Sequence, residues 1–415
     1  MKKILVLGGI PHMIDIVKKI NHLGYYSIVI DNNPLSPAKK IADKSFDIST
    51  TDIESINKLI SDEGIDGVFN AFEDTNTWIA EKISKSNNLS FYASLEQLQI
   101  ASDKENFKNY CKKYKVPVIK EYELEEVQNI KFGDFPIIVK PTDSYGSRGI
   151  SVCNTKNELD LSIKEAKEFS KENSIIIEKF INNNVGVELY YTIKNGEIFL
   201  SAMSDRYVFK IDQKAPPLPS ATFFNSKYLN IYLNNYHELY INMLESLNLR
   251  NCVVAIQALI EDDKIYAYEM SMRLTGEKHY ELINGQNPDM DILAFMINNC
   301  INEDDSSTVY NEMLTKPSCN LALFCEPGKI DKIEGFDQIC LDSNIISKML
   351  FFEEGEKILK TNNYGQMILR LNIQSETSDE LKETIVNILN NFRVLDSKGN
   401  NIIYKTDDFL DFFRR

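Results

Sequence analysis

The segment IIVKPTDSYGSRGI, residues 137–150, determines the fold that this sequence predicts. Its first three residues are β-branched and suit the pleated surface of a sheet, so they predict a strand. Lys140 lies at the end of that strand, and Pro141 stops its ladder because proline has no N–H to donate. The polar loop that follows contains Gly146 and Gly149, which can adopt backbone angles closed to other residues.

This loop can serve as a flap over phosphate groups. Successive backbone N–H groups in such a loop can point at one anion, and Ser144, Ser147 and Arg148 add side-chain donors. A glycine-containing hairpin without any ligand is the alternative, and it is the commoner outcome for so short a motif. The rest of the chain has to decide between the two.

The composition excludes several classes of protein. Acidic residues outnumber basic ones 61 to 46, for a formal charge of −15 over 415 residues, which argues against nucleic-acid binding because that depends on phosphate neutralisation. Seven cysteines without a CxxC pair and four histidines predict no zinc site. Scattered thiols without a signal peptide predict a cytoplasmic protein. No apolar run approaches the roughly 18 residues of a membrane span.

The first hundred residues predict a doubly wound α/β domain. They begin with a strand, an amphipathic helix and a second strand, at residues 2–7, 12–23 and 26–30. Asp31 after the second strand raises dinucleotide binding as an alternative, but the loop Gly8-Gly9-Ile10-Pro11 lacks the third glycine of that motif. Glu73 follows another strand at the edge where ligands gather in such sheets, and a solvated loop acid is its alternative reading.

A capping box at Ser102–Glu105 starts a helix and places Lys104 in its first turn. A cation there opposes the helix dipole, so either the flanking acids offset it or Lys104 meets an anion. The pattern changes to hairpins from here on, which puts a domain boundary near residues 94–103.

The hairpin that begins at Cys252 carries a second polar group. Glu269, Ser271 and Arg273 alternate, so an extended strand points all three to one side. Oxygen ligands and a guanidinium on one face suit Mg²⁺ held against phosphate, and a solvated hairpin edge is the alternative. Gln257 faces the same side only if the turn has an odd number of residues, and a three-residue turn at 261–263 is expected. Beyond residue 316 no site is expected.

In this order the motifs resemble the ATP-grasp superfamily, in particular the branch of biotin carboxylase and the carbamoyl-phosphate synthase large chain with its carboxylate–amine ligase relatives. The resemblance spans nearly the whole chain and implies an α/β (α+β) fold. It implies a Rossmann-like pre-ATP-grasp domain at residues 1–100, a two-lobed ATP-grasp domain at 101–315 with its nucleotide lobe at about 115–180, and a C-terminal subdomain at 316–415.

The resemblance also implies a role for each matching residue. The nucleotide-binding set is Lys104, Lys140, Ser144, Gly146, Ser147, Arg148, Gly149, the hinge Glu178, Lys179, Phe180 and Ile181, and Glu188 near the ribose. The metal-ligand positions are Gln257, Glu269 and Ser271, with Arg273 near the transferred phosphoryl group and Lys210 near the γ-phosphate. The residues expected in the substrate pocket are Glu73, Arg206, His279 and Tyr280.

The implied activity is ATP-dependent ligation, in which a small carboxylic acid is activated as an acyl phosphate and coupled to an amine. The implied cofactors are ATP and one or two Mg²⁺ ions, with Mn²⁺ as an alternative metal. Two residues depart from the pattern, Gln257 in place of the usual glutamate and Ser271 in place of the usual asparagine, and the neutral amide at 257 weakens the cage for one of the two ions. A small-molecule kinase of the same fold and an inactive nucleotide-binding relative are the alternatives. No nucleic-acid or membrane partner is expected, and a homodimer stays open.

Overall fold

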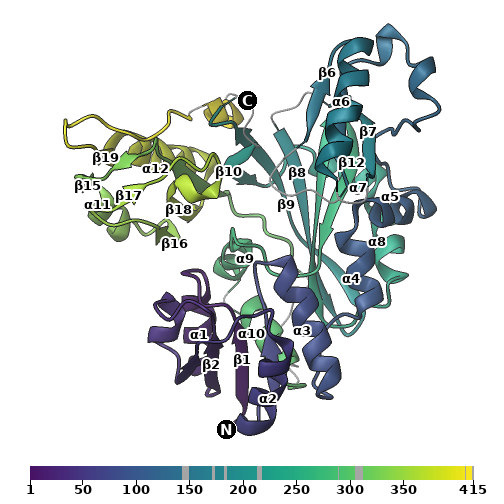
Figure 1. Cartoon of the computed structure of the whole chain (residues 1–415). Coiled ribbons are helices and arrows are strands. Elements are labelled where there is room, and N and C mark those ends of the chain that lie inside the picture. Colours follow the sequence, from purple (N-terminus) through teal and green to yellow (C-terminus); the bar gives the residue numbers. More distant parts are fainter. Residues whose placement is uncertain are drawn as a thin grey trace.

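The computed structural model describes residues 1–142, 149–170, 173–181, 185–212, 217–287, 289–303, 312–406 and 408–413. Three main sheets with helices packed on them confirm the expected mixture of helix and strand (Figure 1). The flap residues Ser144, Gly146, Ser147 and Arg148 lie outside the described residues. Among the residues that are described, no helix is both long enough and apolar enough to cross a membrane.

The N-terminal sheet is parallel, with strand order β3-β2-β1-β4. Its elements are β1 (Lys3–Leu7), α1 (Met13–His22), β2 (Tyr26–Ile30), β3 (Lys44–Phe46), α2 (Ile53–Glu63), β4 (Gly67–Phe69) and α3 (Asp74–Ser86). The predicted doubly wound start is confirmed. The Asp31 carboxylate accepts the N–H of Gly9 at 2.7 Å, so this acid closes the glycine loop from within and its position is explained without a dinucleotide.

A small antiparallel sheet, in the order β6-β5-β7, forms a separate lobe at the upper right of Figure 1. Its elements, with the two helices that precede them, are α4 (Leu95–Ser102), α5 (Lys104–Lys113), β5 (Ile137–Pro141), β6 (Ser151–Cys153), α6 (Lys156–Phe169) and β7 (Ile175–Lys179). The strand predicted from Ile137 to Lys140 is therefore confirmed, but it continues through Pro141, which pairs with Ile175 of β7, so the expectation that proline stops this ladder is wrong. Ile137 and Val139 turn inward and pack with Leu159 and Ala166 of α6, which gives this lobe its own apolar core.

The large sheet is antiparallel and has eight strands in the order β12-β11-β8-β9-β10-β13-β18-β16. Its strands are β8 (Val185–Lys194), β9 (Glu197–Phe209), β10 (Leu218–Phe224), β11 (Cys252–Glu261), β12 (Lys264–Ser271), β13 (Ser318–Phe324), β16 (Ile345–Leu350) and β18 (Met367–Gln374). Strand β10 pairs with β13, so the strands beyond residue 316 continue the sheet that begins in the centre of the chain. The domain boundaries expected from the sequence stay predictions.

The remaining elements cover this sheet or extend its C-terminal end. The helices are α7 (Leu229–Asn235), α8 (His237–Glu245), α9 (His279–Gln286), α10 (Ile292–Asn299), α11 (Phe336–Leu341) and α12 (Ser378–Asn391). Short strands, β14 (Gly328–Lys329), β15 (Lys332–Glu334), β17 (Lys357–Ile358) and β19 (Arg393–Leu395), pair in twos beside them. Helices α4, α5 and α8 contribute to one core against strands β8, β11 and β12.

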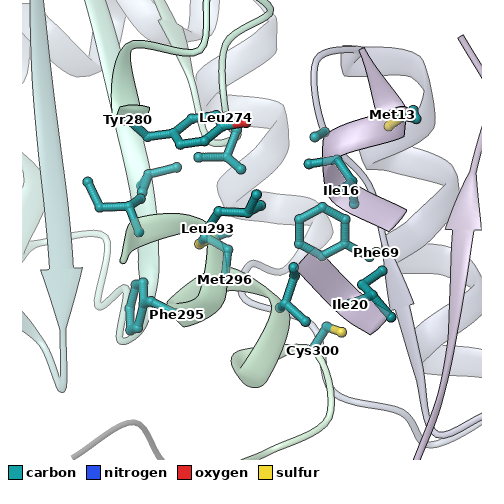
Figure 2. Close-up of a cluster of buried hydrophobic side chains, with 14 of the residues drawn as sticks. Met13, Ile16, Ile20, Phe69, Leu274, Tyr280, Leu293, Phe295, Met296 and Cys300 are labelled. Atoms are coloured by element: carbon teal, nitrogen blue, oxygen red, sulfur yellow. The ribbon is translucent and has the colours of Figure 1, made fainter. Parts of the chain in front are cut away.

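A shared apolar core fixes the N-terminal domain to the segment that follows β12. Figure 2 shows Ile16 and Ile20 of α1 and Phe69 of β4 facing Leu293, Met296 and Cys300 of the α10 region. The approach is close, because a Cβ built on Gly67 would lie 2.5 Å from the carbonyl oxygen of Cys300. The close packing of the two sides therefore requires a residue without a side chain at position 67.

We expect Gly67→Ala to lower the free energy of unfolding by about 1–3 kcal/mol, because the added methyl group overpacks this interface. Gly133→Ala is the matched control, since a Cβ there has no atom within 4 Å, and its effect should stay within about 0.5 kcal/mol. Urea unfolding of the two variants measures the difference. Equal stabilities would contradict the close packing of β4 on α10.

Candidate functional site

The candidate site is a cavity of about 320 Å³, within the usual size range of small-molecule pockets. Three parts of the chain line it: loops of the N-terminal domain, strands β8, β9, β11 and β12 with the segment after them, and the start of β18. The sequence-predicted residues among its lining are Glu73, Glu188, Arg206, Gln257, Glu269, Ser271 and Arg273. The fold thus brings together side chains that are up to 200 residues apart in sequence.

The hairpin β11–β12 places Gln257 directly opposite Glu269, but not in the way that was expected. The turn has two residues, Asp262 and Asp263, both with positive φ, so the three-residue turn is wrong. A β-bulge at Tyr268 adds one residue to β12 and restores the pairing. The Tyr268 hydroxyl then donates to Gln257 Oε1 at 2.6 Å, so the bulge residue also orients the amide.

Glu269 lines the cavity with an exposed side chain, although protein atoms crowd around its carboxyl group. Burial raises the pKa of its carboxyl, and the positive charges of Lys104 and Arg206 offset part of this rise. Within the described ranges, no hydrogen bond to its carboxylate contributes to that pKa. A carboxylate with free oxygens beside the amide oxygen of Gln257 and the Ser271 hydroxyl is a set of oxygen donors that fits Mg²⁺.

Two cations stand close to this group. Lys104 opens α5, whose N-cap is Asp103, accepting the N–H of Asn106 at 2.8 Å, and not the predicted Ser102. Arg273 is held by Asp74 of α3, with its Nε and Nη2 donating to the two carboxylate oxygens at 2.6 and 2.7 Å. This bidentate pair gives the guanidinium a fixed plane. Hence the predicted metal ligands, Lys104 and Arg273 share one region.

Glu188 lies beside the predicted metal ligands. It is the β-ladder partner of Gln257, and Gln257 Nε2 donates to Glu188 Oε1 at 3.5 Å. The guanidinium Nε of Arg206 lies 3.4 Å from Glu188 Oε2. Polar side chains thus form a row across strands β12, β11, β8 and β9, namely Glu269, Gln257, Glu188 and Arg206.

Lys140 belongs to a buried charge network. Its Nζ lies 2.6 Å from Glu178 Oε2, and Glu178 Oε1 contacts the ammonium group of Lys108 in α5. Lys108 also reaches Glu121 Oε1, at 2.7 Å. The network ties the end of β5 to the helix that begins with Lys104, so the two predicted phosphate lysines are linked through α5.

The hinge residues have protein partners of their own. The backbone N–H groups of Lys179 and Phe180 donate to the carbonyls of Lys120 and Pro136, at 3.0 and 2.9 Å. The Lys179 ammonium pairs with Glu261 at 2.5 Å, and Ile181 is buried. These contacts hold the hinge between the small lobe and the β11–β12 hairpin.

Other predicted residues take up separate places. Glu73 lines the cavity as the residue before α3, whereas Lys210 follows β9 and is exposed. His279 and Tyr280 open α9, are buried, and line a smaller cavity together with Tyr190. Gly149 has a φ of +72°, and a Cβ there would lie 2.9 Å from Cγ of Pro141, so the described end of the flap requires glycine.

Several residues of the site were not predicted. His12, Tyr364, Met367 and Arg370 line the cavity, although no site was expected beyond residue 316. Arg370 stands alone among apolar neighbours in a wholly buried strand, and a buried charge in such a run is a usable signal. Lys108, which follows Lys104 by one helical turn, could have been found by that spacing.

Three buried side chains, Glu188, Glu277 and His279, have potential ligand atoms within 4.8 Å of one another. Guanidinium groups lie among them, since Arg206 is next to Glu188 and Arg370 Nη1 is 3.8 Å from Glu277 Oε1. Burial alone would raise the pKa of Glu277, but His279, Arg206 and Arg370 hold it below its usual range. The guanidinium groups of Arg206 and Arg370 already compensate the carboxylates, so a metal ion is disfavoured here.

Comparison with known proteins gives the site its family. Residues 103–277 match the family described as carbamoyl-phosphate synthase L chain, ATP binding domain. The carbamoyl phosphate synthase large chain of Clostridium acetobutylicum is 30% identical over 218 residues, which make up 48% of this chain and 20% of that protein. The chain thus spans only about a fifth of the length of this relative.

Solved structures show the same fold. Phosphoribosylglycinamide synthetase from Anaerococcus prevotii has a TM-score of 0.76 at 19% identity, covering 95% of this chain and 100% of that one. The biotin carboxylase domain of 2-oxoglutarate carboxylase from Hydrogenobacter thermophilus, a complex with MgADP and bicarbonate, has a TM-score of 0.77 at 17% identity, covering 98% and 92%. Residues 103–277 thus match an ATP-binding domain of the carbamoyl-phosphate synthase type, and the chain as a whole has the ATP-grasp fold.

Proposed function

We propose that this protein is an ATP-dependent ligase that activates a small carboxylic acid as an acyl phosphate and couples it to an amine. The observation that carries the proposal is the convergence of Gln257, Glu269, Ser271 and Arg273 on one cavity, with Lys104 beside it. By their names, the relatives above are a carbamoyl phosphate synthase and a phosphoribosylglycinamide synthetase, and the matched family is an ATP binding domain. Free and mostly buried cysteines support the reducing, cytoplasmic setting expected from the sequence.

In the proposed reaction, an oxygen of the substrate carboxylate attacks the γ-phosphorus of ATP, and ADP leaves. The amine nitrogen then attacks the acyl carbon, phosphate leaves, and the nitrogen loses a proton. Phosphoryl transfer needs mainly positioning and charge neutralisation, so the chain contributes cations and oxygen ligands. The C–N bond formed and the P–O bond broken account for one ATP per product.

Each polar residue of the site has a part in this proposal. Gln257, Glu269 and Ser271 would hold Mg²⁺, which neutralises phosphate charge when it is bound; Mn²⁺ suits the same oxygen donors. Lys104 and Lys140 neutralise the triphosphate, and Lys210 reaches the γ-phosphate. Arg273, with its plane fixed by Asp74, stabilises the acyl-phosphate oxygens. The glycine loop at 143–149 excludes water from that reactive group.

The domain proposal follows from the same assignment. Residues 1–100 form the pre-ATP-grasp domain, residues 101–315 the two ATP-grasp lobes, and residues 316–415 the C-terminal subdomain. The hinge Glu178 to Ile181 and the small lobe enclose the adenine end of the nucleotide. Glu73 and Arg206 line the substrate end of the cavity, with His279 and Tyr280 behind it.

The test is a screen for phosphate release with Mg²⁺ and ATP over amino acids and uronic acids, each paired with simple amines. Hydroxylamine is added in parallel, because it traps an acyl phosphate as a hydroxamate. ADP together with a hydroxamate supports the ligase. ADP with a stable phosphorylated product would identify a kinase, and tight ATP binding without ADP formation would identify an inactive relative.

The neutral amide at position 257 leads to a prediction about the metal. Gln257→Glu adds a negative charge to the oxygen cage, and ligand charge tunes the affinity for a divalent cation. We expect the Mg²⁺ concentration at half-maximal ADP formation to fall by roughly five- to tenfold. The Asp262→Glu variant, in the exposed turn of the same hairpin, is the control and should leave it unchanged. A higher Mg²⁺ requirement in Gln257→Glu would contradict the assignment of residue 257.

A further inference from the structure

The C-terminal side of the cavity carries an arginine with unused hydrogen-bond donors. Arg370 of β18 is 4% exposed, and its Nη2 lies 3.4 Å from the Met367 sulfur. Among the described residues, its Nε and Nη1 have no hydrogen-bond partner. A buried guanidinium without partners is costly, so a ligand that binds these donors would be stabilised strongly.

The surroundings hold this guanidinium in place without neutralising it fully. Its central carbon lies 5.9 Å from the centre of the Tyr364 ring, a cation–π contact. The acidic group facing it is Glu277, whose Oε1 is 3.8 Å from Nη1, beyond a good hydrogen bond. Glu277 Oε2 lies 3.0 Å from His279 Nε2, so this carboxylate stands between His279 and Arg370.

His12, contributed by the N-terminal domain, faces the same part of the cavity. Burial, together with the positive charges of Arg370 and Lys278, lowers the pKa of His12 to about 4. The imidazole is therefore neutral at physiological pH and offers a hydrogen bond without adding charge. Arg370 therefore offers free donors beside a neutral imidazole, and because Glu277 already offsets part of its charge, the arrangement accepts no more than a single negative charge.

Position in the sheet separates Arg370 from the nucleotide residues. Strands β8, β9, β10 and β13 lie between β11, which carries Gln257, and β18, which carries Arg370. The proposed metal ligands therefore come from one end of the sheet and Arg370 from near the other end. This separation in the sheet assigns an anion at Arg370 a place apart from the triphosphate and from the carboxylate that has to meet the γ-phosphorus.

We propose that Arg370 binds a carboxylate of a substrate other than the carboxylate that is activated, which makes that substrate either a dicarboxylic acid or an amino acid. The assignment rests on the proposed ligase function. A singly charged carboxylate fits better than a phosphate group, because the nearby Glu277 repels a second negative charge. The two sources are distinguished by experiment: the extra carboxylate belongs to the activated acid or to the amine.

The experiment measures binding by calorimetry in the presence of MgADP, with two probes and their neutral counterparts. Malonate against malonamide represents the acid source, and L-alanine against L-alaninamide represents the amine source. The proteins are the wild type, Arg370→Met and Arg370→Lys. We expect at least one carboxylate probe to bind the wild type better than its counterpart, and its Kd to rise at least about tenfold in Arg370→Met, with Arg370→Lys between them.

The results separate this inference from the proposed function. The inference is overturned if neither malonate nor L-alanine binds the wild type. It is also overturned if Arg370→Met binds these probes as tightly as the wild type does. The Kd for MgATP, measured on the same three proteins, tests the ligase independently, because failure of the wild type to bind MgATP overturns that proposal. The melting temperatures of the three proteins, measured alongside, separate lost probe binding from lost folding, and Arg370→Lys retains the positive charge beside Glu277.

Discussion

Glu269→Gln is expected to lower the rate of ADP formation by at least about 100-fold, since even partners that only support a metal ligand are worth 10–100-fold. The substitution keeps the shape of the side chain and removes the charge that the oxygen cage depends on. Steady-state ADP release at saturating acid and amine measures the effect. Asp263→Asn is the matched control, because it makes the same chemical change at the exposed turn of the same hairpin and should leave the rate unchanged.

The folded state should tolerate this change. Burial raises the pKa of Glu269, which means that its ionised form is less favourable in the folded protein than in the unfolded chain at neutral pH. Removing that charge should therefore leave the melting temperature of Glu269→Gln equal to the wild-type value or higher. An inactive variant with a lowered melting temperature would point to a structural role. Normal ADP release from Glu269→Gln would overturn its assignment as a metal ligand.

The β11–β12 hairpin shows what could and what could not be predicted from the sequence. Alternation alone put Glu269 and Ser271 on one face, and that follows from strand geometry. For Gln257 to lie opposite Glu269, an odd number of residues was needed in the turn. The turn has two residues, and the extra residue of the bulge at Tyr268 restores the pairing. A bulge without glycine has no strong local signature in the sequence. The correct pairing was therefore predicted from an incorrect turn length.

Long-range register explains what the sequence could not predict. Arg370 enters the cavity because β18 joins the central sheet through β13 and β10, and such pairing between strands far apart in sequence is not written in any local pattern. The first residues of helices could be predicted more closely from the sequence. Asp103, one residue from the expected cap, is as good an N-cap as serine, so the sequence left two neighbouring choices for the start of α5.

The largest effect on stability is expected at the network of Lys108, Glu178 and Lys140. Lys108 and Glu178 are almost fully buried, and removing one partner of a buried pair leaves the other charge uncompensated, at a cost of about 3–5 kcal/mol. We expect this loss in the free energy of unfolding of Glu178→Met and of Lys108→Met, measured in urea. The double variant should recover most of it, because two apolar side chains can replace the pair.

A neighbouring ion pair provides the control. Lys179 follows Glu178 in β7 and pairs with Glu261, but both side chains are partly exposed, so Glu261→Met should cost less than about 1 kcal/mol. Equal losses in Glu178→Met and Glu261→Met would show that burial does not strengthen the network. A double variant as unstable as the sum of the two single variants would likewise contradict the pairing of Lys108 with Glu178.

The dependence on pH has a definite sign. Burial would raise the pKa of Glu178, but Lys140 and Lys108 outweigh it and hold that pKa below the usual value of 4.5. A depressed carboxyl pKa contributes stability above the unfolded-state pKa, and that contribution disappears as the pH falls through the folded-state value. The gap in unfolding free energy between the wild type and Glu178→Met should therefore be widest near pH 7 and narrow below about pH 4.5. A gap that stays constant down to pH 3 would mean that the Glu178 carboxylate is not ionised in this network, and the ion pair that links β5 to α5 would then have to be abandoned.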